Sequence, residues 1–245
     1  MAPRQDPYTI LADYYDSAWY EYSEYMEQLI LDLERESRRR FSRVCDAACG
    51  SGLLLQNLND GTRSLTGYDR TARMIERARM RLPAGKLAVG DLRETPPFPG
   101  PFDLVTCVYD SLNYLLDAED LHRFFRAARG IIASAGVLVV DLNDHTMYQD
   151  RDGTVQHRLI GGVGIRERLV YDPGPPPRAL TTFEFPDGTE EHRQRPWETH
   201  EVEQILDMEG WQLLDTMDVV DDDDDQPSGK VVYIAVPAEQ RPRKV

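Results

Sequence analysis

Short apolar runs alternate with amphipathic segments between residues 43 and 145 of this 245-residue chain. The apolar runs have the length and composition of strands, and they span residues 43–49, 64–69, 86–92, 102–110 and 137–144. Between them, apolar residues recur at helical spacing in segments 53–58, 71–82 and 118–134. Strand–helix repeats of this kind bury a sheet between two layers of helices. The pattern therefore predicts a doubly wound, mostly parallel α/β sheet.

The segments next to this core predict a lid and an insertion. Residues 18–40 carry apolar side chains at spacings of three and four, so we expect residues 1–42 to form an N-terminal helical lid. The cofactor-binding core is then 43–145. Three alternating runs between 155 and 195 are joined by turns rich in proline and glycine. They predict a small antiparallel β insertion after strand five, at 146–196, which would cover the substrate.

The C-terminal segment, 197–245, is predicted to return to the core as a helix and two final strands, which brings the sheet to seven strands. Thr199 is the expected N-cap of that helix, without a full capping box. The strands are expected at 211–220 and 230–238. The acidic run Asp221–Asp225 between them is expected to be a solvated loop.

Charge and composition exclude several classes of partner. The chain has 43 acidic and 28 basic residues, a formal net charge of -15. A field of that sign repels phosphate backbones and anionic lipids, so we expect neither nucleic acid nor a membrane as a partner. No stretch approaches the roughly 20 apolar residues of a membrane span, and the expected location is cytoplasmic. The cysteines Cys45, Cys49 and Cys107 suit neither a disulfide framework nor a metal site, and are expected to be buried apolar side chains.

A glycine turn, DAACGSG at 46–52, follows the first strand. Gly50 and Gly52 lack a Cβ, so a ligand can approach the backbone closely at the start of the following helix. A dinucleotide fingerprint would need a third glycine where this chain has Leu55. This difference counts against a site for a pyrophosphate.

Acidic residues stand at the ends of the first three strands. Asp46 belongs to the first, and Asp69 at the end of the second can accept hydrogen bonds from ribose hydroxyls or cap the next helix. Asp91, in GDLRE, ends the third strand, where a carboxylate can accept from an adenine amine. Three acids with a truncated glycine motif favour adenosine without a pyrophosphate.

The motifs DAACGSG, GYD, GDLRE and FDLVTCVYDSLNYL together resemble class I S-adenosylmethionine-dependent methyltransferases over about residues 12–145. ADYYD near the N-terminus and the antiparallel insertion are also similar to bacterial small-molecule enzymes, in particular the amino-sugar N,N-dimethyltransferases. One departure is Ala48, where the family's first motif glycine usually stands.

The resemblance implies S-adenosyl-L-methionine as the cofactor, with ten residues around it. They are Asp46, Ala48 and Gly50 at the methionine moiety, Asp69 at the ribose, Arg70 and Met74 beside the adenosine, Asp91 and Leu92 at the adenine, and Val108 and Tyr109 beneath the methionine. The implied reaction is an in-line methyl transfer to a nitrogen, or less favourably an oxygen, of a small metabolite.

Three residues are candidates for contact with the acceptor. Tyr114 stands where the resembling amino-sugar enzymes carry a histidine, and Tyr15 where the family's N-terminal helix closes the site. His145 is the only histidine at the carboxyl end of a predicted strand, and its intrinsic pKa suits a base at neutral pH. The alternatives are a surface-loop histidine at 145, which the sequence favours, and packed aromatic side chains at 15 and 114.

Two alternatives stay open from the sequence. An NAD(P)-dependent oxidoreductase shares the sheet, the turn and Asp69, and a non-catalytic or regulatory protein could keep the fold and bind the cofactor without turnover. The sequence also leaves a homodimer open.

Overall fold

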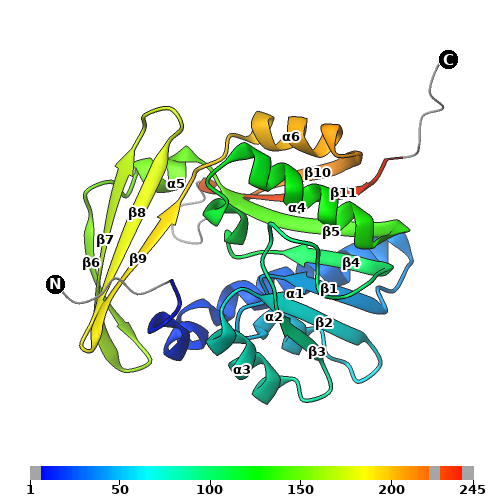
Figure 1. Ribbon diagram of the computed structural model, residues 1–245, viewed down its shortest axis with the longest axis horizontal. Coiled ribbons are helices and arrows are strands. Elements are labelled where there is room, and N and C mark those ends of the chain that lie inside the picture. The colour runs from blue at the N-terminus through cyan, green and yellow to red at the C-terminus, as the bar shows by residue number, and fades with distance from the viewer. Residues whose placement is uncertain (1–6, 221–226, 239–245) are drawn as a thin grey trace.

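The computed structural model describes residues 7–220 and 227–238, and they form two β-sheets joined by helices (Figure 1). The larger sheet has seven strands in the order β10-β11-β5-β4-β1-β2-β3. Their bounds are β1 Arg43–Ala47, β2 Ser64–Asp69, β3 Lys86–Val89, β4 Phe102–Cys107, β5 Ile132–Asn143, β10 Trp211–Val220 and β11 Pro227–Pro237. Strand β11 runs antiparallel to β5 and β10, and the pairs from β5 to β3 are parallel. The predicted seven-stranded, mostly parallel sheet is confirmed.

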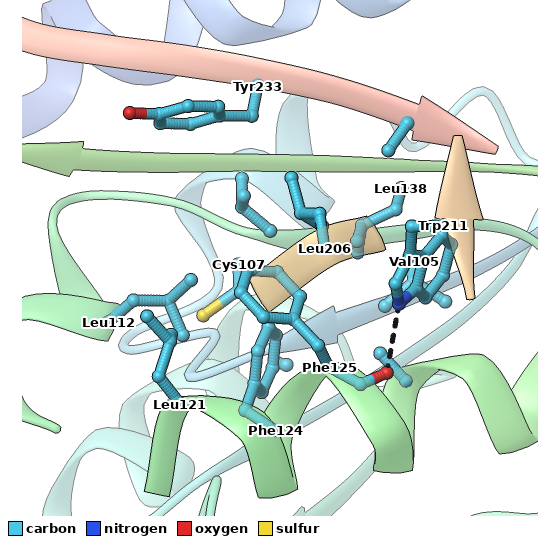
Figure 2. Packing of buried hydrophobic residues seen from close by; sticks show 14 of the residues in the cluster. Val105, Cys107, Leu112, Leu121, Phe124, Phe125, Leu138, Leu206, Trp211 and Tyr233 are labelled. Atoms are coloured by element: carbon cyan, nitrogen blue, oxygen red, sulfur yellow. Dashed lines mark hydrogen bonds between the residues drawn. The ribbon is translucent and has the colours of Figure 1, made fainter. Parts of the chain in front are cut away.

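Helices cover both faces of this sheet. One face carries α1 Tyr15–Ser37, α2 Leu53–Asn57 and α3 Ala72–Arg81, whose apolar side chains share a core with the strands. The other face carries α4 Ala118–Ile131 and α6 Thr199–Met208. Figure 2 shows this second core, where Phe124 and Phe125 of α4 pack toward the strands. The indole N–H of Trp211 donates to the Phe125 carbonyl at 3.1 Å, so even this buried polar group is satisfied.

The smaller sheet is antiparallel and has four strands in the order β6-β7-β8-β9. They are β6 Val155–Ile160, β7 Val163–Asp172, β8 Arg178–Phe185 and β9 Gly188–Gln194. The sequence predicted three runs here, and β6 was missed because most of its residues are exposed and lack an apolar alternation. A two-residue turn joins β6 to β7, and Gly161 and Gly162 supply the positive φ values that such a turn requires.

The N-terminal segment connects the two sheets. The short helix η1 Leu11–Asp13 leads into α1, and Ile10 and Leu11 share a small apolar cluster with Ile165 and Phe183 of the smaller sheet. In Figure 1 this segment and the start of α1 lie beside that sheet, while the rest of α1 extends along the larger one. The domain boundaries given above stay predictions.

The N-cap prediction for α6 was wrong. The cap is Glu198, and a capping box is present, because the Glu198 side chain accepts from the backbone of Glu201 while the Glu201 carboxylate accepts from the backbone N–H of Glu198. A glutamate in place of the usual serine or threonine hid this box in the sequence.

All three cysteines are buried and free, as expected. Residues 221–225 lie outside the described residues. Every helix within 7–220 and 227–238 is too short or too polar to span a bilayer.

Gly67 of β2 allows the glycine turn to pack closely on the sheet. A Cβ there would lie 2.8 Å from Cδ1 of Leu55 and 2.9 Å from Sγ of Cys49, both of which are buried. We expect Gly67→Ala to lower the free energy of unfolding by about 1–3 kcal/mol through overpacking, as measured by urea denaturation.

Gly130 of α4 provides the matched control, because no described atom lies within 4 Å of a Cβ built on it. Gly130→Ala should raise stability by about 0.5–1 kcal/mol, since alanine favours the helix. Equal stability of the Gly67→Ala variant and the wild type would contradict the packing argument.

Candidate active site

A cavity of about 410 Å³ opens at the carboxyl ends of β1, β2 and β3, where the N-terminal segment lies next to the larger sheet. A much smaller space of about 10 Å³ shares Tyr15, Ala48 and Gly50 with it. All ten residues predicted to contact the cofactor line one or both of these spaces. Asp69, Arg70, Met74, Asp91 and Leu92 line the larger space, Asp46, Val108 and Tyr109 line the smaller one, and Ala48 and Gly50 line both. The structure thus brings the set together, while the individual contacts stay predictions.

The glycine turn has an unusual backbone. Ala48, Gly50 and Gly52 all have positive φ angles, of 58°, 53° and 82°. Glycine adopts this conformation without steric cost, whereas alanine pays for its Cβ, which explains why a glycine would suit position 48. The turn leaves the Gly50 backbone bare toward the cavity, with only Tyr15 Cε1 within 4 Å of a built Cβ among the described atoms.

Asp69 ties this turn to the start of α3. One carboxylate oxygen accepts from the Gly50 N–H at 3.0 Å and the other from the Thr71 N–H at 2.7 Å. Both roles considered from the sequence are compatible, because each carboxylate oxygen keeps a lone pair that can accept a ribose hydroxyl. Burial raises the pKa of Asp69, because it disfavours the ionised carboxylate. A hydrogen-bond donor or a cation nearby would oppose this effect.

Asp46 is buried beneath the smaller space. The Thr106 hydroxyl donates to its Oδ1 at 2.6 Å, yet burial raises the pKa of Asp46 to about 7, with Asp69 and Asp141 adding to the effect. A cationic amine next to Asp46 would counter this shift by favouring the charged carboxylate.

Asp91 lies on the wall of the larger space and is paired with Arg93. The Arg93 guanidinium donates from Nε to Oδ1 at 2.8 Å and from its terminal nitrogen to Oδ2 at 2.6 Å. This pairing lowers the pKa of Asp91 and fixes the direction of its carboxylate. This arrangement suits a nucleoside. The lone pairs of Asp69 can accept hydrogen bonds from the sugar hydroxyls, the oriented Asp91 carboxylate can accept from the ring amine, and the glycine turn leaves space for the ligand.

The turn after β4 is held by residues that the sequence analysis missed. Tyr109 and Asp110 have positive φ angles, and both backbone N–H groups donate to the buried carboxylate of Asp141 on β5. Lys230 of β11 pairs with Asp110 at 2.8 Å. The signal for Asp141 was an acidic residue within an otherwise apolar strand, VLVVDLN.

Of the three residues predicted to meet an acceptor, two line the cavity and one does not. Tyr15 lies close to Gly50 of the glycine turn, with its ring stacked on Trp19 at a centroid distance of 4.9 Å, and Tyr114 also lines the cavity. His145 lies just past β5, as the sequence predicted, but it does not line this cavity. Directly after β5 the chain enters an unpredicted helix, α5 His145–Gln149, and His145 lies 3.0 Å from Glu198 in the lining of a separate pocket.

The histidine that does approach the cavity wall is His192 of β9. Its Nδ1 lies 2.6 Å from the Tyr114 hydroxyl, and its Nε2 lies 3.3 Å from Glu190. Tyr8, also missed, places its hydroxyl 3.0 Å from that of Tyr114. Inward positions of β9 alternate as Glu190, His192 and Gln194, all buried, so a period of two was present in TEEHRQ but was hidden by polar residues on both faces.

Comparison with known proteins adds independent information. The family described as "Methyltransferase domain" matches residues 44–136. A protein named as a methyltransferase in Geobacillus sp. (strain WCH70) is 26% identical over 246 residues, which cover 90% of this chain and 98% of that protein. The dTDP-3-amino-3,6-dideoxy-alpha-D-glucopyranose N,N-dimethyltransferase of Streptomyces fradiae is 29% identical over 44% of this chain and 42% of its own length.

Among solved structures, an S-adenosylmethionine-dependent methyltransferase from Clostridium acetobutylicum ATCC 824 is similar in fold. Its TM-score is 0.79 at 22% identity, with 95% of this chain and 99% of that chain covered. The similarity in fold therefore extends well beyond residues 44–136.

Asp46 should make stability depend on pH. Its pKa is raised from an unfolded value near 3.9 to about 7, so it favours the folded state only while protonated. This contribution is complete below about pH 4 and is lost as pH rises to about 7. Asparagine does not titrate, so the stability of Asp46→Asn relative to wild type should increase by about 4 kcal/mol at most between pH 4 and 8.

Urea denaturation across this pH range measures the difference. Thr106→Val provides a second check, because it removes a hydrogen bond that favours the charged carboxylate, and the transition should move to higher pH. A difference between Asp46→Asn and wild type that stays constant with pH would show that Asp46 is ionised throughout.

Proposed function

We propose that this chain, which belongs to the class I S-adenosylmethionine-dependent methyltransferases, methylates a nitrogen of a small molecule. The observation that carries the proposal is a pair of adjoining spaces, which are lined by the ten residues predicted to contact the cofactor and, in the larger space, also by Tyr8 and Tyr114. Related proteins that act on amino sugars support nitrogen as the acceptor atom. The match of residues 44–136 to the methyltransferase family model sets aside the oxidoreductase alternative.

The cofactor supplies a methyl group on a positively charged sulfur. In this proposal Asp46 and the turn at Ala48 and Gly50 hold the methionine end, Asp69 holds the ribose, and Asp91 with the Leu92 amide holds the adenine. Tyr15 closes the space above the turn. Alignment of an acceptor with the reacting bond is worth roughly 7–11 kcal/mol, so rigid positioning by this chain is its main contribution.

The acceptor end of the cavity has an aromatic, hydroxyl-bearing wall. The rings of Tyr8 and Tyr15 meet edge to face at 5.8 Å, and the rings of Tyr8 and Tyr114 lie 5.9 Å apart. Aromatic faces attract an ammonium group, and neutral tyrosine hydroxyls can accept its hydrogen bonds. Burial raises the pKa of Tyr114 well above its ordinary value, so it is present as the neutral hydroxyl. This environment suits an amine better than an alcohol, which would need a strong base.

Loss of either acid from the cofactor site should weaken cofactor binding. We expect Asp69→Asn and Asp91→Asn each to raise the dissociation constant for S-adenosylmethionine about tenfold or more, because each removes a charge-assisted hydrogen bond. Isothermal titration calorimetry measures this constant. Glu119→Gln, on the exposed outer surface of α4, is the matched control and should bind like the wild type. Unchanged affinity in both aspartate variants would refute the assigned site.

The acceptor is tested by mass spectrometry with methyl-labelled cofactor. dTDP-3-amino-3,6-dideoxy-α-D-glucopyranose and simple cyclic amines serve as nitrogen acceptors, with the matching alcohols as controls. We expect label on the amines. Transfer to alcohols alone would contradict the nitrogen assignment. Cofactor binding without transfer to any acceptor in the panel would favour a non-catalytic protein.

A further inference from the structure

A chain of hydrogen bonds leads from the cavity wall into the smaller sheet. The Tyr114 hydroxyl lies 2.6 Å from Nδ1 of His192, and Nε2 of His192 lies 3.3 Å from Oε2 of Glu190. Tyr114 lines the cavity, whereas His192 and Glu190 lie behind it with exposed fractions of 2% and 0%. A buried imidazole and carboxylate in contact with a cavity hydroxyl require an explanation, because burying such groups is costly.

The partners of Glu190 define where the hydrogen atoms lie. Its carboxylate accepts backbone N–H groups from Tyr8 at 3.2 Å, from Leu11 at 3.3 Å and from Ile10. At each of these three contacts the carboxylate is the acceptor, and its contact with His192 follows the same pattern when the imidazole hydrogen lies on Nε2. We therefore assign the hydrogen of His192 to Nε2, which donates to Glu190.

This tautomer determines the donor and the acceptor in each of the other hydrogen bonds of the network. With the hydrogen on Nε2, the Nδ1 lone pair faces Tyr114, whose hydroxyl donates to it. The Tyr114 oxygen in turn accepts from the Tyr8 hydroxyl, 3.0 Å away, and keeps one further lone pair. Because Tyr114 lines the cavity, an acceptor in the cavity has access to that lone pair.

We propose that Tyr114 and His192, oriented by Glu190, form a proton-transfer chain that deprotonates an ammonium acceptor before it is methylated. This inference rests on the proposed N-methylation. Tyr114 is the group in contact with the acceptor. His192 and Glu190 act through it and are positioning residues, with His192 also the resting place of the proton.

The step balances in protons and electrons. An ammonium proton moves to the Tyr114 oxygen while the Tyr114 hydroxyl proton moves to Nδ1 of His192, which leaves a lone pair on the acceptor nitrogen. That lone pair forms the N–CH3 bond as the C–S bond of the sulfonium breaks, and the C–S electron pair stays on sulfur. The imidazolium lies against the Glu190 carboxylate and returns its proton along the same route after the product leaves.

The surroundings of His192 favour this direction of transfer. Its ring meets Tyr8 from the N-terminal segment and Phe183 from β8 edge to face, each at 5.0 Å, and Tyr114 at 6.0 Å. Two acidic groups lie nearby: Glu190 on the same strand, and Asp110, which acts on both Tyr8 and Tyr114 and is paired with Lys230. Because burial opposes ionisation of Tyr114, this residue passes the proton to His192 and does not retain the negative charge.

The tautomer can be tested without any acceptor. Long-range ¹H–¹⁵N correlation spectra of the labelled full-length protein report the protonation of each imidazole nitrogen, and the spectrum of His192→Asn identifies the His192 signals by their loss. We expect neutral His192 with hydrogen on Nε2, and a shifted Nδ1 signal in Tyr114→Phe. Hydrogen on Nδ1 at neutral pH would close the route and overturn the proposal.

The second experiment measures kcat for the methylation of an amine acceptor. His192→Asn and Tyr114→Phe should lower kcat by about 10²–10⁴-fold while the affinity for S-adenosylmethionine stays unchanged, which also shows that the variants are folded. The pH profile of kcat should also differ in shape between the wild type and His192→Asn, because asparagine cannot take up the proton that Tyr114 passes on. A merely structural role would lower kcat without changing the shape of the profile.

His122→Asn is the matched control, because His122 of α4 also pairs with a glutamate, Glu209 at the end of α6, at 2.9 Å, and neither residue lines the cavity. It should retain wild-type kcat. If amines are methylated but His192→Asn keeps kcat close to that of wild type, the proton-transfer chain is overturned and the N-methylation stands. If no amine is methylated, the proposed function fails, and the tautomer measurement still decides the hydrogen-bond chain.

Discussion

Strand β1 pairs in parallel with β2 on one side and β4 on the other, with Asp46 opposite Gly67 and Thr106. Parallel strands place their carboxyl ends at one edge of the sheet, so the turns after β1, β2 and β4 meet there. The Gly50 N–H then donates to Asp69, which joins the first turn to the second. The cavity and all ten predicted cofactor residues depend on this pairing, because a change of register would separate the turns or bury them.

The smaller sheet is part of the same site. Glu190 of β9 accepts backbone N–H groups from the segment that carries Tyr8, and the apolar cluster around Ile10 and Phe183 packs that segment against the sheet. The insertion was predicted only to cover the substrate, and it has a further structural role. It holds the N-terminal tyrosines at the cavity and supplies the imidazole that meets Tyr114.

Buried carboxylates at this edge of the sheet favour a positively charged group placed close to them. Burial raises the pKa values of Asp46, Asp69 and Asp141, so each carboxylate is costly in its ionised form unless a donor or cation is near. Asp141 meets this cost with Lys230 and two backbone N–H groups, while Asp46 has one hydroxyl donor. A cationic amine or sulfonium at this edge would recover part of the cost, which agrees with the cofactor.

The sequence by itself determined the order of the core, because apolar runs and glycine turns are local signals of strands and their ends. From these it located Asp46, Asp69 and Asp91 at one sheet edge. The sequence did not identify Glu198 as the N-cap of α6. His145 was the candidate histidine for contact with the acceptor, because the end of a predicted strand was the only local signal. Only the tertiary structure decided that His192 meets Tyr114, residues 78 positions apart. That contact depends on how a polar antiparallel strand packs against a distant turn, and neither periodicity nor motif spacing encodes such a contact.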